Sequence, residues 1–451
     1  MGFGWRRRRS TAGNNGGKKV ESGIGDRREL ELEELAIPNH FLCPISLELM
    51  TDPVTLSSGI TYDRESIERW LEAGNFTCPV TNKVLSSFDQ IPNHALRGMI
   101  QDWGTENCRH GVKRIPTPRV PVAPFEVSEV LSGIEGASQR VDCAECSELV
   151  GKIEKWGGES ERNRRCIVAN GAASMLARAF DTFAATSNYR QIGGNLLEEV
   201  LSALSWMFPL DIEAHHYLAS RSSLNCLVWF LKNGDIEAKK HAILTLKELS
   251  SDEKQTGALA DTEGLHETLV EFIKHPSNPT ITKASLSVTL NLISSCRRGD
   301  EERLVFVEMC LVSNLLEILI DSSDKSVCEK ALGVLQGLIG CEQGREKAYA
   351  NLLTVPILVK KVLRVSATAT DFAVSSLWRL CKDESSRDHQ GRALVDALQV
   401  GAFQKLLLVL QLGCADETKE KATELLKLMN PSRAGLECIE SADFKNLKRS
   451  F

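Results

Sequence analysis

Apolar residues recur at helical spacing through most of the chain after about residue 125. Five segments share one pattern, in which an alanine begins a run with apolar residues three or four positions apart. These alanines stand at positions 242, 284, 331, 373 and 422, which are 42, 47, 42 and 49 residues apart. This recurrence predicts a stack of repeated helical units. A second apolar helix is expected before each segment, at 224–231, 265–273, 315–320, 356–363 and 403–410.

A helical repeat of this length is typical of armadillo and HEAT proteins. One earlier unit is expected around 196–208, and a degenerate first unit at 143–156 and 166–180. A single unit cannot bury both of its apolar faces, whereas stacked units form a continuous core and a long groove that suits extended partners. We therefore predict an α-solenoid over residues 125–430 that holds a protein partner, followed by a C-terminal tail at 431–451.

Residues 37–111 have a different pattern, in which short apolar runs alternate with turn residues. The runs at 54–56 and 60–62 flank a three-residue loop containing glycine, which predicts a β-hairpin. Asp63 and Asn93 each precede an amphipathic helix, and we expect both side chains to cap it. The pattern predicts a small α+β domain, so the fold class of the whole chain is mostly α.

Two segments lack such patterning. Residues 1–36 are rich in Gly, Arg and Glu, so they predict a disordered tail of mixed charge with a basic start. A myristoylation signal after Gly2 would need Ser or Thr at position 6, where this chain has Arg6. Four prolines in residues 112–124 exclude a regular helix and predict an extended linker. They are Pro116, Pro118, Pro121 and Pro124.

Composition narrows the class of protein. The chain has 451 residues, 42% hydrophobic and 25% charged, with a net charge of −6, which argues against a nucleic-acid partner. No apolar run reaches membrane-spanning length, and the basic start lacks the apolar core of a secretory signal. The 14 cysteines, many within helical patterns, are expected to be reduced thiols. We expect an intracellular, cytoplasmic protein, while Arg6 to Arg9 leave a nuclear or peripheral membrane pool open.

The small domain resembles a U-box in the order and spacing of its motifs. Followed by armadillo-like repeats, it is similar to the shorter plant U-box/armadillo-repeat ubiquitin ligases, which lack a helical domain before the U-box. The motifs that carry the resemblance are Phe-Leu-Cys-Pro-Ile at 41–45, Glu-Leu-Met at 48–50, Asp-Pro-Val at 52–54, Gly-Ile-Thr-Tyr-Asp-Arg at 59–64, Thr-Cys-Pro at 77–79, and Ile-Pro-Asn at 91–93.

The resemblance implies an E3 ubiquitin ligase that docks a ubiquitin-conjugating enzyme charged with ubiquitin. Transfer to a lysine of a substrate held by the repeats would then rest on proximity and orientation, without a covalent intermediate on this chain. Where members often carry Arg or another donor that braces the donor ubiquitin, this chain has Asn82, followed by Lys83. By position in the family pattern, the conjugating enzyme would contact Ile45, Leu47, Trp70 and Pro79.

A RING domain reaches a similar fold with two zinc ions, which need about eight Cys and His ligands. The domain here offers only Cys43, Cys78, His40 and His94 up to residue 104, so we expect neither metal nor cofactor. Nothing in the sequence near the two cysteines supplies a general base, so we interpret them as structural thiols. Polar bracing is expected to stabilise the domain instead. The candidates are Glu48, Asp52, Asp63, Arg64, Asn93 and Arg97.

Two other functions compete with the ligase. Asn82 favours a non-catalytic scaffold, whose U-box docks the conjugating enzyme without activating it. A nuclear-import receptor would carry a ladder of Trp and Asn along its groove, whereas Trp206, Asn291 and Trp378 occur irregularly. A homodimer stays compatible with the sequence.

Overall fold

The computed structural model describes residues 37–108, 121–186, 194–295, 299–386 and 392–431. The predicted N-terminal tail at 1–36, all but the first residue of the predicted C-terminal tail at 431–451, and most of the predicted linker lie outside the described residues. The chain divides at residue 120 into two compact units.

The first unit contains a three-stranded antiparallel sheet with the strand order β2-β1-β3. Val54 of the central strand pairs with Tyr62 on one side and with Pro92 on the other. The predicted hairpin is present, closed by a hydrogen bond of 3.1 Å from Leu56 N to Ile60 O. The elements are η1 (Asn39–Phe41), β1 (Pro53–Thr55), β2 (Thr61–Asp63), α1 (Arg64–Glu72), β3 (Ile91–Pro92) and α2 (His94–Glu106).

The two predicted helix caps differ in the structure. Asn93 caps α2, because its side chain accepts a 3.0 Å hydrogen bond from Leu96 N. Asp63 stands at the N-cap position of α1 without capping it. Its carboxylate instead accepts hydrogen bonds from Thr51 N (2.8 Å) and Asp52 N (2.9 Å). The prediction that Asp63 caps α1 was wrong, since the neighbouring loop competes for the same oxygen atoms.

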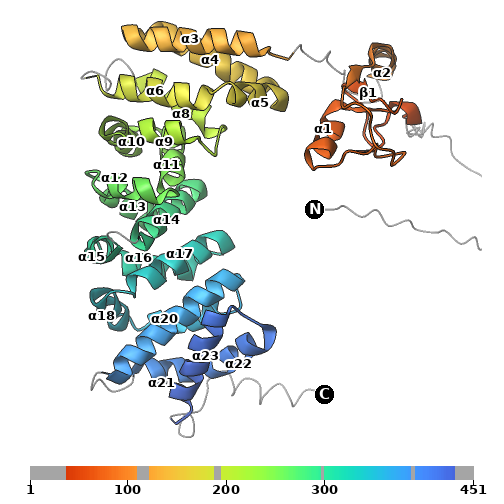
Figure 1. The fold of residues 1–451 in the computed structure, drawn as a ribbon. Coiled ribbons are helices and arrows are strands. Elements are labelled where there is room, and N and C mark those ends of the chain that lie inside the picture. Colours follow the sequence, from red (N-terminus) through yellow and green to blue (C-terminus); the bar gives the residue numbers. More distant parts are fainter. Residues whose placement is uncertain (1–36, 109–120, 187–193, 296–298, 387–391, 432–451) are drawn as a thin grey trace, which may run out of the picture. The chain divides into compact units, whose positions relative to one another are not determined.

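The second unit is a stack of helices whose buried side chains form one continuous core from Val127 to Met429. Figure 1 shows α14, α17 and α20 packed side by side, with the shorter α12, α15 and α18 along one side of the stack. The helices are α3 (Pro124–Arg140), α4 (Cys143–Glu159), α5 (Glu161–Ala169), α6 (Ala172–Ala184), α8 (Gly194–Ser205), α9 (Ile212–Leu218), α10 (Arg221–Asn233), α11 (Ile236–Ser250), α12 (Glu253–Ala260), α13 (Leu265–Lys274), α14 (Pro279–Ser294), α15 (Gly299–Glu308), α16 (Leu311–Asp321), α17 (Lys325–Leu338), α18 (Glu342–Ala350), α19 (Thr354–Lys361), α20 (Ala367–Ser386), α21 (Arg392–Gln399), α22 (Ala402–Leu412) and α23 (Asp416–Met429).

Each repeated unit contains three helices, whereas the sequence pattern predicted only the second and third. The third helices α11, α14, α17, α20 and α23 coincide with the five aligned segments, and each packs on the next. Asp235, Asn278 and Asp324 cap three of these helices through their side chains. The structure therefore has the architecture of an armadillo solenoid.

A recurring hydrogen bond joins consecutive units. Arg164 Nε on α5 donates to Gly157 O of α4, at 2.8 Å. Arg303 Nη2 on α15 donates to Ile293 O of α14, at 3.2 Å, and Arg345 Nη1 on α18 donates to Gly340 O just after α17, at 2.9 Å. A helix C-terminus carries partial negative charge on its last carbonyls, so a guanidinium group stabilises it.

Two details of the sequence prediction need correction. Pro124 was expected to exclude a helix, but it occupies the first turn of α3, where a missing N–H is tolerated. Residues 166–180 are divided between α5 and α6 by a turn at Gly171, whose φ of +79° belongs to the left-handed region.

No single helix among the described residues is both long enough and apolar enough to cross a membrane. Helices α21 and α22, which meet at a bend of 73°, have the length and composition of a membrane span only when they are taken together.

Candidate functional site

Two loops of the first unit have the same backbone hydrogen bonds. In the first loop, residues 43–48, Cys43 N donates to Glu48 O and Leu47 N to Cys43 O, both at 2.8 Å. In the second loop, residues 78–83, Cys78 N donates to Lys83 O and Asn82 N to Cys78 O, also at 2.8 Å. Their sequences, Cys-Pro-Ile-Ser-Leu-Glu and Cys-Pro-Val-Thr-Asn-Lys, match in type at the first four positions. The unit therefore presents one loop geometry twice.

The cysteine sulfur of each loop is buried and hydrogen-bonded to β2. Asp63 N donates to Cys43 Sγ at 3.3 Å, and Tyr62 Oη lies 3.0 Å from Cys78 Sγ. Tyr62 and Asp63 are neighbours on β2, so one strand holds both loops. Burial alone would raise the pKa of Cys78, but hydrogen bonds from Ser58, Thr81 and Tyr62 outweigh it and lower that pKa to about 6.

Helix α1 is attached to the second loop through Trp70. Its indole Nε1 donates a 2.8 Å hydrogen bond to Thr77 O, and Asn75 Nδ2 donates to Trp70 O at 3.1 Å. Because Thr77 comes two residues before Pro79, the Trp70 ring is fixed beside the start of the second loop. Loop and helix are thus oriented by a side chain that is itself only half-buried.

The four residues expected to contact the conjugating enzyme differ in exposure. Leu47 is 73% exposed, whereas Ile45, Trp70 and Pro79 are half-buried and Ile45 and Trp70 pack partly on the core. Val80, which follows Pro79, is 52% exposed and was missed by the sequence prediction. Its equivalence to Ile45 in the repeated loop sequence would have indicated it.

Asn82 and Lys83 are both exposed at the end of the second loop. Asn82 has a φ of 55°, a left-handed conformation that Asn tolerates better than most residues. Within the part of the chain that the structure describes, neither side chain has a hydrogen bond or an ion pair. Both are therefore available to a partner.

A network around Asp52 joins the sheet to both helices. Arg64 Nε at the start of α1 donates to Asp52 Oδ2 at 2.6 Å, and Arg97 on α2 binds the other carboxylate oxygen. Arg64 Nη1 also donates to Gln90 Oε1 at 3.0 Å. The side chains of Asp52, Arg64 and Arg97 are each less than one-fifth exposed, so solvent weakens the attraction between their charges only a little.

The remaining bracing candidates divide into two groups. Asp63 and Asn93 make the hydrogen bonds described above, and Asn93 Nδ2 also lies 3.4 Å from the hydroxyls of Thr55 and Thr61. The Glu48 side chain is exposed and makes no hydrogen bond or ion pair with the described residues. Over those same residues, no three His, Cys, Asp or Glu side chains gather where they could hold a metal ion.

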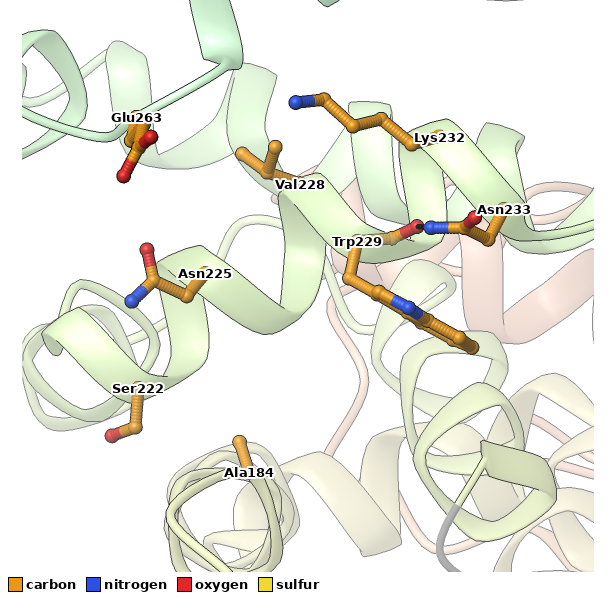
Figure 2. Close-up of a pocket in the computed structure, with 8 residues that line it drawn as sticks. All are labelled: Ala184, Ser222, Asn225, Val228, Trp229, Lys232, Asn233 and Glu263. Carbon is orange, nitrogen blue, oxygen red and sulfur yellow. Dashed lines mark hydrogen bonds between the residues drawn. The ribbon is translucent and has the colours of Figure 1, made fainter. Parts of the chain in front are cut away.

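The repeats contain hollows that a partner could enter. One of about 370 Å³ lies along α10, where Asn225 and Glu263 point toward one another across the opening (Figure 2). Lys232 and Glu263 line it without an ion pair to any described residue. Charged, polar and apolar side chains therefore line this hollow together.

Asn291 and Trp378 on third helices, and Trp206 directly after α8, are engaged within the chain. Asn291 Nδ2 donates to Ser250 Oγ at 3.0 Å, and Trp378 Nε1 donates to Glu424 Oε2 at 2.5 Å. The Arg164 guanidinium carbon lies 5.6 Å from the centre of the Trp206 ring. These side chains stabilise neighbouring units, so they do not form the free ladder that an import receptor needs.

Comparison with known proteins agrees with both units. Residues 37–109 match the U-box domain family, and residues 126–449 match the family described as the plant U-box protein ARM repeat region. A designed armadillo repeat protein is 18% identical, covers 56% of this chain, is itself 99% covered, and has a TM-score of 0.45.

Curated relatives from Arabidopsis thaliana match along nearly the whole chain. U-box domain-containing protein 21 is 42% identical over 454 residues, with 100% of each chain covered. U-box domain-containing protein 20 is 43% identical, with 93% of each covered. E3 ubiquitin-protein ligase PUB23 is 35% identical, with 88% of this chain and 93% of the relative covered. The chain therefore belongs to the plant U-box/armadillo-repeat family of E3 ubiquitin-protein ligases.

Proposed function

We propose that the two loops and α1 dock a ubiquitin-conjugating enzyme carrying ubiquitin, and that the armadillo repeats hold the substrate whose lysine receives it. The observation that carries the proposal is a set of one exposed and three half-buried apolar side chains on two loops fixed to one strand and on α1. They are the exposed Leu47 and the half-buried Ile45, Trp70 and Pro79. Anchored apolar side chains of this kind dominate protein interfaces, because they lose little conformational freedom on binding.

Transfer in this proposal involves no thioester on the U-box cysteines. Cys43 and Cys78 are both 0% exposed, and their sulfur atoms are hydrogen-bonded to Asp63 N and to the Tyr62 hydroxyl of β2. Neither sulfur has the access that attack on a thioester requires. The chain then contributes orientation: it holds the conjugating enzyme's thioester and the substrate lysine together. A ubiquitin adduct on this chain that a thiol reductant removes would contradict this point.

The experiment compares Ile45→Ala with Met99→Ala in the full chain. Ile45 lies in the proposed docking surface, which the two loops and α1 form, whereas Met99 is an exposed apolar residue on α2, outside that surface. We expect Ile45→Ala to slow ubiquitin discharge from a panel of conjugating enzymes at least about tenfold, the loss typical of an interface anchor. Met99→Ala is expected to match the wild type. Equal rates for Ile45→Ala and the wild type would refute the proposed docking surface.

A further inference from the structure

Three arginines from different helices converge near the C-terminus of α17. A Cβ atom added at Gly340 would lie 3.0 Å from Arg379 Nη1 and 3.7 Å from Arg303 Cζ. Those two guanidinium groups are therefore no farther apart than the sum of these distances. Arg345 Nη1 reaches the same turn, where it donates to Gly340 O at 2.9 Å. We call Arg303, Arg345 and Arg379 the arginine cluster.

Backbone carbonyls hold the cluster in place. Arg379 Nη1 donates to Gln336 O and Arg303 Nη2 to Ile293 O, both at 3.2 Å. A helix C-terminus contributes only about half a negative charge, which is less than the charge that these groups bring together. The carbonyls therefore explain where the guanidinium groups lie and leave their positive charge incompletely balanced.

Carboxylates balance the neighbouring cations more fully than they balance Arg379. Asp300 lies 2.5 Å from Arg303, and Asp383 lies 3.3 Å from Arg345. Glu424 lies 3.3 Å from Lys382 on the next turn of α20. Arg379 has no such ion pair among the described residues. Burial, followed by the like charges of Arg303 and Arg345, lowers the pKa of Arg379, although Glu417 acts in the opposite direction.

A hollow of about 300 Å³ opens directly onto this cluster. It is lined by Gly340, Arg345, Trp378, Arg379, Lys382 and Asp383. The Lys382 ammonium lies 4.4 Å from the centre of the Trp378 ring, which holds the lysine beside the opening. Three cations and one carboxylate line the hollow, so it favours an anionic ligand.

We propose that this hollow binds a phosphorylated serine or threonine in a segment of a partner protein. A phosphate monoester brings nearly two negative charges and three acceptor oxygens, which suits planar guanidinium donors better than a single carboxylate does. Clustered arginines are the general means of recognising phosphorylated segments. The volume exceeds that of one phosphate group, so it also accommodates flanking residues against Trp378.

The proposal rests on the proposed function in one respect, namely that the bound partner is a ubiquitination substrate. Phosphorylation of that partner would then control whether the repeats present it for transfer. Binding itself needs neither ubiquitin nor a conjugating enzyme, so it is tested without them.

The test measures binding of the full chain to a degenerate peptide pool with phosphoserine at a fixed central position. The same pool with unmodified serine, a pool with central aspartate, and inorganic phosphate serve as comparison probes. We expect the phosphoserine pool to bind at least about tenfold more tightly than the three other probes. Equal binding of the serine pool, of the aspartate pool or of inorganic phosphate would overturn the proposal.

Variants locate the site. Arg379→Gln and Lys382→Gln are each expected to weaken binding of the phosphoserine pool about tenfold, with an unchanged melting temperature. Arg178→Gln, on α6, removes a guanidinium that is paired with Glu135 away from this hollow, and it is expected to bind like the wild type. Lys382 is exposed, so its variant keeps the test valid if Arg379→Gln unfolds.

Ile45→Ala separates this proposal from the docking of the conjugating enzyme. That variant is expected to bind the phosphoserine pool like the wild type, whatever its rate of ubiquitin transfer. If Arg379→Gln and Lys382→Gln both bind the phosphoserine pool as tightly as the wild type does, the proposal that this hollow is the binding site is overturned.

Discussion

At the scale of single residues, the two loops differ most at their left-handed position. Leu47 has a φ of 59° and Asn82 a φ of 55°, although Leu adopts this conformation at a cost of roughly 1–2 kcal/mol. Leu47 is also among the most exposed apolar residues that the structure describes. A strained and exposed leucine does not stabilise the fold. This observation favours a role for Leu47 in binding a partner.

Leu47→Asn should therefore separate stability from binding. Since Asn accepts a left-handed backbone more readily, the free energy of unfolding should not fall and should rise by up to about 1 kcal/mol. Affinity for a conjugating enzyme should fall, because the apolar contact is lost. Urea denaturation and calorimetric titration measure the two quantities. A variant that binds like the wild type would show that Leu47 makes no contact.

The sequence led to a set of proposed docking side chains, but it did not predict the backbone conformation that presents them. Ile45, Leu47, Trp70 and Pro79 were assigned from their positions in a family pattern, while the positive φ of Leu47 contradicts the usual preference of leucine. Only the repeated Cys-Pro loop sequence could have indicated that Leu47 and Asn82 share a conformation. The same comparison would have identified Val80.

At the scale of elements, the first unit depends on polar contacts between helices and sheet. Its core has ten buried apolar side chains among the described residues, which is a small core for a domain. Asp52 connects β1 to α1 and α2 by accepting from both Arg64 and Arg97. Losing this carboxylate leaves two poorly hydrated guanidinium groups without their partner.

Asp52→Ala should lower the free energy of unfolding of this unit by about 2–3 kcal/mol, since charged hydrogen bonds at low exposure are lost. The matched control is Glu65→Ala, which removes the exposed pair of Glu65 with Arg69 and should change stability by about 0.5 kcal/mol or less. Chemical denaturation followed by Trp fluorescence measures both. Equal effects of the two substitutions would contradict the bracing role of Asp52.

Helical periodicity revealed the long helices of the repeats but missed the short first ones. Helix α9 has seven residues, of which only Ala214 and Leu218 are buried, so its apolar pattern is too brief to recognise. The third strand was missed for the same reason, because β3 comprises only Ile91 and Pro92. A long helix or strand can be recognised in the sequence because its buried positions recur at a regular spacing. The conformation of a short one depends on tertiary contacts that the sequence pattern does not show.

At the scale of the whole molecule, the two units have separate cores and different sources of stability. The first relies on a small core with an ion-pair network, and the second on one core that runs through all the units. Their unfolding should therefore be independent.

Scanning calorimetry of the full chain should show two transitions. Asp52→Ala is expected to shift only one of them to lower temperature, and Arg345→Ala only the other, since each removes contacts within a single core. For each kcal/mol of lost stability, the melting temperature should fall further for the smaller unit than for the larger one, because the smaller unit has the smaller unfolding entropy. A single transition displaced by both substitutions would show that the units unfold together.

The arginines that join consecutive units at three junctions have an evolutionary consequence. A unit that begins with Arg303 on α15 ends with the Gly340 carbonyl after α17, which accepts from Arg345 of the following unit. Duplication of such a segment copies a donor at its start together with an acceptor at its end. The inserted copy would meet compatible neighbours on both sides, so the array can lengthen by whole units without new complementary mutations.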